Sequence, residues 1–146
     1  MDRGKYREIL SRLEIFKNIT EFEYKNIMAE IRVAERNFSK DSVILHQGDI
    51  YNDLHIIING SCIGQMIDFS GKCIKIEDFI SPFILASGIL FLKKNILPVT
   101  VIAITDTKFL TINKNDVLKL CTLRKKFLKN FLADVSDKIV FISEKL

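Results

Sequence analysis

The feature that most constrains the fold of this chain is a change of hydrophobic period near residue 32 and again near residue 112. Outside these points apolar residues recur every three or four positions, as on one face of a helix, whereas between them apolar and polar residues alternate in short runs. Turn residues, including Gln47-Gly48-Asp49 and Asn59-Gly60, separate the runs. Many short strands at this spacing favour an antiparallel barrel or jelly roll. The predicted strands are Ser42–His46, Leu54–Asn59, Cys62–Asp68, Cys73–Glu77, Val99–Thr105 and Lys108–Ile112.

Both ends of the chain are predicted to be helical. From residue 4 onward apolar residues follow a helical spacing, and after a break at Asn18 the pair Thr20 and Glu23 forms a capping box ahead of a second helical segment. Near the other end, Asn113 or Asn115 caps a short helix, and a long helix covers residues 124–146. We therefore expect an N-terminal helical segment over 1–31, a mainly β jelly roll over 32–112 and helices over 113–146.

Charge and cysteine content narrow the functional classes. The chain has 22 Lys and Arg against 18 Asp and Glu, and this net charge of +4 is weak evidence for a nucleic-acid surface. The first residues are charged, which excludes a secretory signal, and no apolar stretch reaches the ~20 residues of a membrane span. Cys62, Cys73 and Cys121 lack CxxC spacing and are expected to be reduced thiols. We expect a cytoplasmic protein that does not associate with membranes.

The predicted long helix carries two apolar stripes. One is a heptad-like seam with the spacing 4-3-4-3-4: Leu128, Leu132, Val135, Ile139, Ile142 and Leu146. The other consists of Phe127, Phe131 and Phe141. One barrel rarely needs both stripes, so we expect the phenylalanines to pack on the barrel and the seam to pack on the twin helix of a homodimer. The alternative is that the seam packs on its own barrel.

The run from His46 to Ser61, HQGDIYNDLHIIINGS, resembles the signature of cyclic-nucleotide-binding domains. In that signature a Gly-Asp turn, here Gly48-Asp49, an apolar strand and an Asn/Ser-Gly turn, here at Gly60, follow one another at this spacing. Glycine suits both turns because they require a positive φ or a bulge that a Cβ would obstruct. Together with the helical start and the long terminal helix, the whole chain resembles the sensor half of the Crp–Fnr transcription regulators, a double-stranded β-helix or jelly roll.

The resemblance implies an effector pocket between the barrel and the long helix. Members that bind cyclic AMP have a Phe-Gly-Glu turn whose Glu binds the ribose, and an Arg ten residues later that binds the cyclic phosphate. Here Leu85-Ala86-Ser87 aligns with the turn and Leu97 takes the Arg position, so both anchors are missing. We expect a less charged effector, or a position that side chains fill. The implied lining is Leu85, Ala86, Ser87, Leu97, Val99, Thr100, Ile142 and Ser143.

In the Crp–Fnr family a winged helix-turn-helix follows the sensor half, and an effector changes how the paired long helices cross. The chain ends at Leu146, inside its seam, so we expect contact with DNA only through a domain that is not in this chain. The sequence predicts an effector-sensing, dimerising domain rather than an enzyme. A stand-alone dimerising module without an effector is one alternative.

A cupin-type metalloenzyme is the other alternative, because cupins share the jelly roll. With only two histidines, His46 and His55, the chain lacks the three histidines of a cupin site, and we expect no metal site. Haem bound through His46, His55 or a cysteine is the one cofactor that the composition leaves open. The simpler interpretation is that each histidine ends a strand with its ring satisfied.

Overall fold

The computed structural model describes residues 3–145, with the side chains of 75, 76 and 140–145 left undescribed. The helices, two of them short 3-10 helices labelled η, are η1 (Arg3–Tyr6), α1 (Arg7–Leu10), η2 (Glu14–Phe16), α2 (Glu21–Glu30), α3 (Lys114–Leu123) and α4 (Lys125–Lys145). The strands are β1 (Val33–Phe38), β2 (Val43–Leu45), β3 (Asp53–Asn59), β4 (Ser61–Ile67), β5 (Cys73–Ile80), β6 (Phe83–Leu85), β7 (Thr100–Ala103) and β8 (Thr107–Asn113).

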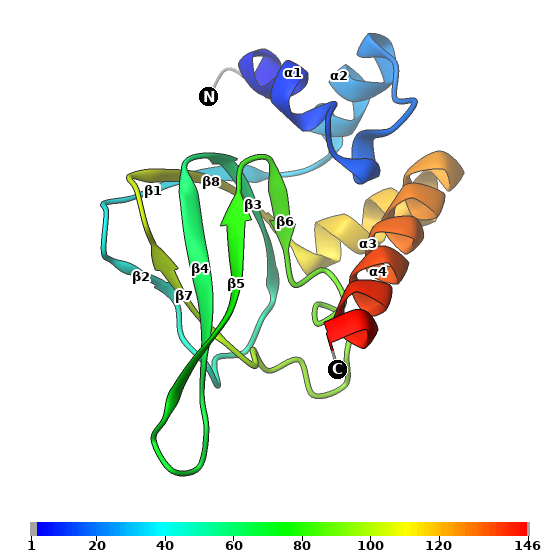
Figure 1. The fold of residues 1–146 in the computed structure, drawn as a ribbon. Helices are drawn as coiled ribbons and strands as arrows, with labels where there is room; N and C mark the ends of the chain where they lie inside the picture. Colours follow the sequence, from blue (N-terminus) through cyan, green and yellow to red (C-terminus); the bar gives the residue numbers. More distant parts are fainter. Residues whose placement is uncertain (1–2, 146) are drawn as a thin grey trace.

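The strands form two antiparallel four-stranded sheets, ordered β1-β8-β3-β6 and β2-β7-β4-β5. Strands far apart in the sequence are paired, as in the register of Val33 with Ile112. The inner faces of the two sheets meet in an apolar core, so the expected mainly β architecture is confirmed, and the pairing is consistent with a jelly roll. Figure 1 shows the β4–β5 hairpin extending well beyond the body of the barrel. The core between the sheets contains Ile44, Ile57, Cys62, Leu85, Val101, Ala103 and Phe109.

A second core joins the barrel to the helices, which gather on one side of it (Figure 1). Phe127 of α4 lies edge-on to Phe16, with ring centroids 6.3 Å apart. The buried amide of Asn130 donates to the carbonyls of Ile15, at 3.1 Å, and Lys17, at 2.8 Å. An ion pair between Arg124 and Glu30 adds a link from the start of α4 to the end of α2. These contacts fix the first turns of α4 against the N-terminal helices.

Most predicted elements are present, including the Thr20–Glu23 capping box and the Asn113 cap of α3. The first predicted helix is instead broken into η1, α1 and η2. Leu13, Ile15 and Phe16 are all buried, and one face of a straight helix cannot bury all three, so the chain turns at Leu13. The alternation pattern also misses β1 and β6.

The two signature glycines adopt the backbone that the sequence predicts. Gly48 has φ of 93° and Gly60 has φ of 92°. A Cβ on Gly60 would lie 2.4 Å from the carbonyl oxygen of Asp106, so this turn excludes any other residue. The carboxylate of Asp49 accepts a hydrogen bond from the backbone N–H of His46 at 3.4 Å, which helps to stabilise the turn that contains Gly48. Within residues 3–145 the structure has no helix that is long and apolar enough to cross a membrane.

Candidate effector site

The turn that follows β6 is the centre of the predicted effector site. Ala86 has a positive φ of 50°, in the left-handed region, which suits the glycine of the family's Phe-Gly-Glu turn. The next residue, Ser87, is 1% exposed. The hydroxyl of buried Tyr51 donates to the carbonyl of Leu85 at 2.5 Å and accepts the backbone N–H of His55 at 2.9 Å. Burial raises the pKa of Tyr51, so the phenol keeps its proton and holds the end of β6.

Ser87 faces α4 and not the solvent. Its hydroxyl donates to Asp134 Oδ2 at 2.6 Å, and Lys138 Nζ donates to the same oxygen at 2.7 Å. Burial lowers the pKa of Lys138, and the carboxylate of Asp134 acts in the opposite direction. The Lys138 ammonium also lies 5.0 Å from the ring centroid of Phe83. A polar bridge therefore joins the turn after β6 to the long helix.

The remaining barrel residues of the predicted pocket lie on the segment that enters β7. Leu97, at the position of the family's Arg, is 2% exposed, and its backbone pairs with the signature turn through Gly48 N–H and the Asp49 carbonyl, both at 2.9 Å. Val99 packs against the core between the sheets, and Thr100 Oγ1 accepts the N–H of Gln47 at 3.0 Å. These contacts tie this segment to residues 47–49, whereas those of Ser87 tie the β6 turn to α4.

Two predicted pocket residues, Ile142 and Ser143, belong to α4, but their side chains lie outside the described residues. Asp134 and Lys138 were not among the residues predicted from the sequence to belong to the site. Their i,i+4 spacing is the one available signal, because it lets a carboxylate and an ammonium meet on one helix face. Sequence analysis also missed Asn95, whose amide donates to the Tyr51 carbonyl at 2.9 Å and anchors the β6–β7 segment.

The two apolar stripes of α4 differ in exposure. Phe127 is 1% and Phe131 is 5% exposed, so both are buried. The expected packing on the barrel is not what Phe127 shows, because its ring lies edge-on to Phe16 of η2, whereas Phe131 meets Phe91 on the β6–β7 segment. Among the seam residues, Leu128, Leu132 and Ile139 are 37%, 55% and 58% exposed, and Val135 is half-buried beside Gly88. The side chains of Phe141, Ile142 and Leu146 lie outside the described residues. The outer face of α4 is therefore an apolar surface that this chain does not cover at Leu128, Leu132 and Ile139.

The two histidines occupy different environments. His46 is exposed after β2, whereas His55 is buried inside β3, stacked on Tyr51 and edge-on to Phe109. Its Nδ1 pairs with the Asp53 carbonyl at 2.8 Å, while the buried Nε2 has no hydrogen-bond partner among the described residues. The expectation of a strand-end histidine with a satisfied ring is therefore wrong for His55. Burial lowers its pKa. The described side chains include no group of three or more His, Cys, Asp or Glu arranged to hold a metal ion.

Residues 35–123 match the family model of the cyclic nucleotide-binding domain. The chain belongs to that family. A search of curated protein sequences found no match. Among solved structures, a transcriptional regulator from Thermotoga maritima is 30% identical, with 83% of this chain and 92% of that chain covered and a TM-score of 0.73.

Two more distant structures support the fold of this cyclic nucleotide-binding domain. The sensor domain of the transcriptional regulator DNR from Pseudomonas aeruginosa is 13% identical, with 98% of this chain and 94% of that chain covered and a TM-score of 0.79. The catabolite activator protein of Thermus thermophilus is 15% identical at a TM-score of 0.77, covering 90% of this chain and 61% of that chain. Together with the family model and the 30% identical transcriptional regulator from Thermotoga maritima, this shared fold confirms the family resemblance drawn from the sequence.

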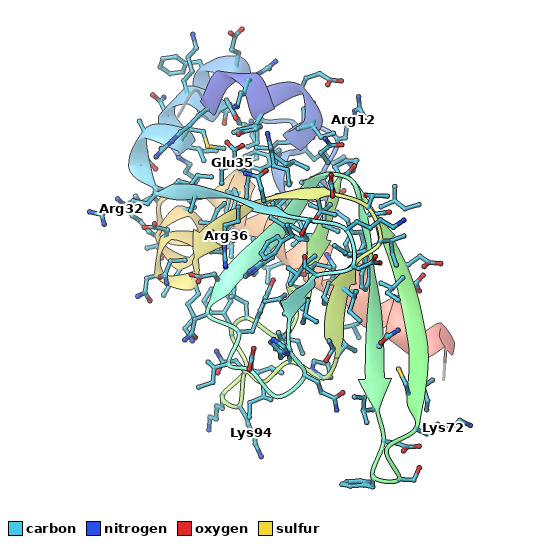
Figure 2. The ribbon with its side chains drawn as sticks, turned by 90° about the vertical axis from the view of Figure 1, so that its left-hand side faces the viewer. Arg12, Arg32, Glu35, Arg36, Lys72 and Lys94 are labelled. Atoms are coloured by element: carbon cyan, nitrogen blue, oxygen red, sulfur yellow. The ribbon has the colours of Figure 1, made fainter. Side chains whose placement is uncertain are left out.

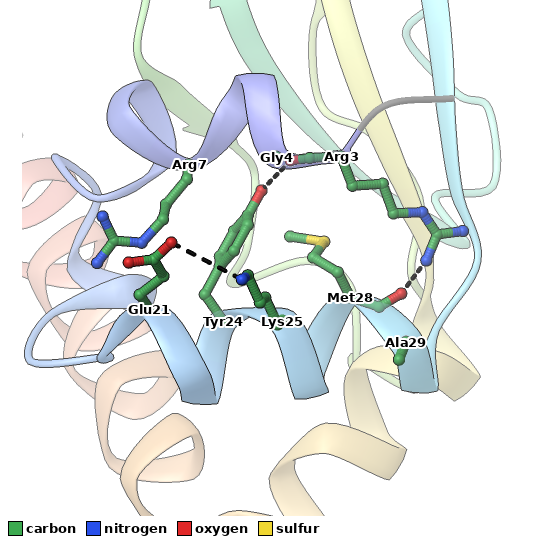
Figure 3. A pocket seen from close by; sticks show the side chains of 8 residues that line it. All are labelled: Arg3, Gly4, Arg7, Glu21, Tyr24, Lys25, Met28 and Ala29. Atoms are coloured by element: carbon green, nitrogen blue, oxygen red, sulfur yellow. Dashed lines mark hydrogen bonds and ion pairs between the residues drawn. The ribbon is translucent and has the colours of Figure 1, made fainter.

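A surface pocket of about 500 Å³ lies between η1, α1 and α2, away from the turn after β6 (Figure 3). Most of its charges are engaged within the fold: Arg3 caps the end of α2 through the carbonyls of Met28 and Ile31, and Lys25 lies 3.9 Å from Glu21. The buried Nε of Arg7, which also lines the pocket, has no hydrogen-bond partner within the described part of the chain. The Tyr24 hydroxyl closes one side by donating to the Arg3 carbonyl at 2.6 Å. Three basic side chains, Arg3, Arg7 and Lys25, and one acidic side chain, Glu21, line the pocket, so its walls carry an excess of positive charge.

The five basic side chains labelled in Figure 2 lie in separate parts of the domain. Figure 2 shows Arg12 near the N-terminal helices, Arg32 and Arg36 at β1, Lys94 on the β6–β7 segment and Lys72 at the hairpin tip. Separation of this kind is typical of solvated lysines and arginines and not of a basic patch on one face.

Proposed function

We propose that this chain is the effector-sensing and dimerisation domain of a Crp–Fnr-like transcriptional regulator, that it is not an enzyme and that it works in the cytoplasm. Family membership supports a regulatory binding role, and the neighbours named above are transcriptional regulators. In such regulators a helix-turn-helix contacts DNA, and we assign DNA recognition to that element and not to these 146 residues.

The observation that carries the proposal is the division of α4 into a buried and an exposed apolar face. Phe127 is buried against the N-terminal helices while Leu132 and Ile139 remain open to solvent. A second copy, packed about a two-fold axis, would cover this face with the same side chains from its own α4. We infer that an effector shifts the population of crossing geometries between the two helices.

The effector on this proposal is not cyclic AMP. Ser87 and Leu97 stand where the family's Glu and Arg bind the ribose and the phosphate, and neither offers the required charge. Both side chains are almost fully buried, which supports a smaller and less polar ligand. The same burial favours the second candidate function, a dimerising module that binds no effector.

Mass spectrometry of the protein purified from its host, under native and then denaturing conditions, separates these candidates. The sensor proposal predicts a small molecule that is released in a fixed ratio to the chain when the protein unfolds. The absorbance spectrum of the same sample tests for haem. If the chain is dimeric but neither retains a small molecule nor binds an added one, the result would favour the dimerising module that binds no effector.

A further inference from the structure

The bridge of Ser87, Asp134 and Lys138 crosses from the barrel to α4. Both donors, the Ser87 hydroxyl and the Lys138 ammonium, meet one oxygen, Asp134 Oδ2. The side chains of Lys138 and Asp134 are 19% and 13% exposed, so this charged pair is largely shielded from water. A shielded pair is held more strongly than a surface pair, and loss of one partner leaves the other charge uncompensated.

Apolar groups surround the bridge. Phe83 lies under the Lys138 ammonium and stacks on Phe79, with ring centroids 5.0 Å apart. On the other side, a Cβ built on Gly88 would be 4.0 Å from Val135 Cγ1, so the turn and the helix nearly touch. The bridge therefore sits in a closed contact and not in an open polar cleft.

The position of the bridge along α4 determines which part of the helix it can hold against the barrel. The first turns of the helix are held by Phe127 and Asn130, and the helix backbone runs along η2 and α3. From Phe131 onward the contacts with the barrel include the Phe91–Phe131 ring pair and the bridge. Val135 also packs against the core there, and the bridge adds a polar contact that holds the second half of α4, which carries Ile139 of the exposed seam, against the barrel.

We propose that Ser87, Asp134 and Lys138 form an intramolecular latch that closes the effector position and holds the second half of α4 on the barrel in the absence of ligand. Asp134 takes the hydrogen bond of Ser87 that a ligand would otherwise receive, and an effector acts by displacing it. This inference deepens the proposed function, because it assigns the regulation of the same site.

Hydrogen–deuterium exchange of the full chain tests the latch. Loss of a hydrogen bond to a charged group typically changes an equilibrium by about 10- to 100-fold. We expect Ser87→Ala and Lys138→Met to speed amide exchange of residues 132–145, and of Ile89 and Leu92 in the β6–β7 segment, by about tenfold or more. Amides in the β3–β8 pairing should keep their wild-type rates. Asp134→Asn removes the shared acceptor and should give the same pattern.

Matched controls are available on the same helix. Ser136, whose hydroxyl donates to the carbonyl of Leu132 within α4, and exposed Lys129 allow the control variants Ser136→Ala and Lys129→Met. These variants should exchange like the wild type. Unchanged exchange in both Ser87→Ala and Lys138→Met, with the fold intact by circular dichroism, would overturn the latch. If Asp134→Asn does not fold, the other two variants decide the result. Light scattering on the same samples reports the dimer separately, so failure of the proposed function and failure of the latch give different results.

Discussion

Phe131 and Leu132 are neighbours on α4 with opposite environments. Phe131 is 5% exposed and packs edge-on against Phe91, with ring centroids 5.8 Å apart, whereas Leu132 is 55% exposed. One helix therefore presents an apolar face to its own fold and another to the outside. Soluble proteins seldom leave such a stripe uncovered, and this contrast is the physical basis for the proposed dimer.

Truncation on the two faces should have different consequences. Phe127→Ala removes a fully buried ring and should lower the free energy of unfolding by about 3–5 kcal/mol at any protein concentration. Leu132→Ala should lower the melting temperature in a way that depends on concentration, because it weakens association. Leu118, 53% exposed on α3, is the matched control, and Leu118→Ala should change stability by about 0.5 kcal/mol or less. Equal losses for Leu132→Ala and Leu118→Ala at every concentration would count against a dimer seam.

Cyclic AMP should bind weakly. Each missing charge-assisted hydrogen bond contributes about 1.5–3 kcal/mol, so the changes at Ser87 and Leu97 predict a Kd above about 100 μM. Isothermal titration calorimetry checks this value. A low-micromolar Kd would contradict it. Exposed Lys93 and Lys94 would then be tested as replacement charges by substituting each with Ala.

Stability should depend on pH through His55. Burial lowers its pKa in the folded chain, whereas in the unfolded chain the pKa returns to about 6.5. As the pH is lowered, the unfolded state therefore binds the proton before the folded state does. The free energy of unfolding should be highest above about pH 6.5 and should fall as the pH drops from there to the folded pKa. For this single group, the free energy of unfolding changes by at most about 1.4 kcal/mol per pH unit.

Chemical denaturation at about pH 7 and pH 5, above the ordinary carboxyl pKa values, measures the effect of His55. His55→Phe keeps an aromatic ring between Tyr51 and Phe109 and should remove the slope. His46→Gln, at the exposed histidine, should retain it. A wild-type slope that persists in His55→Phe would show that another group titrates.

Local patterns predicted the elements whose signals lie in adjacent residues. The capping box at Thr20 and the positive φ at Gly60 are examples, and the phenylalanine stripe of α4 was recognised from helical spacing. Strand β1 was not predicted because only Val33 in it is buried, so the strand shows no alternation of apolar and polar residues. It is held in place by its long-range pairing with β8. Three-residue β6 is too short to show alternation.

The site was less predictable than the fold. The family alignment found Ser87, but its partner Asp134 is 47 residues away and looks like an ordinary solvated side chain in the helix pattern. Asn130 could not be predicted for the same reason, since its amide donates to carbonyls of a segment more than 100 residues earlier. Such contacts follow from tertiary packing and carry no local sequence signal.

Multi-angle light scattering at tens of micromolar tests the central claim most directly. The wild-type chain should have twice its monomer mass of 16.8 kDa. The double variant Leu132→Asp and Ile139→Asp should be monomeric, because pairing would have to desolvate charges in the middle of the seam. Leu118→Asp, outside the seam, should remain dimeric. A monomeric wild-type chain would contradict the account, because the exposed apolar face of α4 would then not pack on the same helix of a second copy.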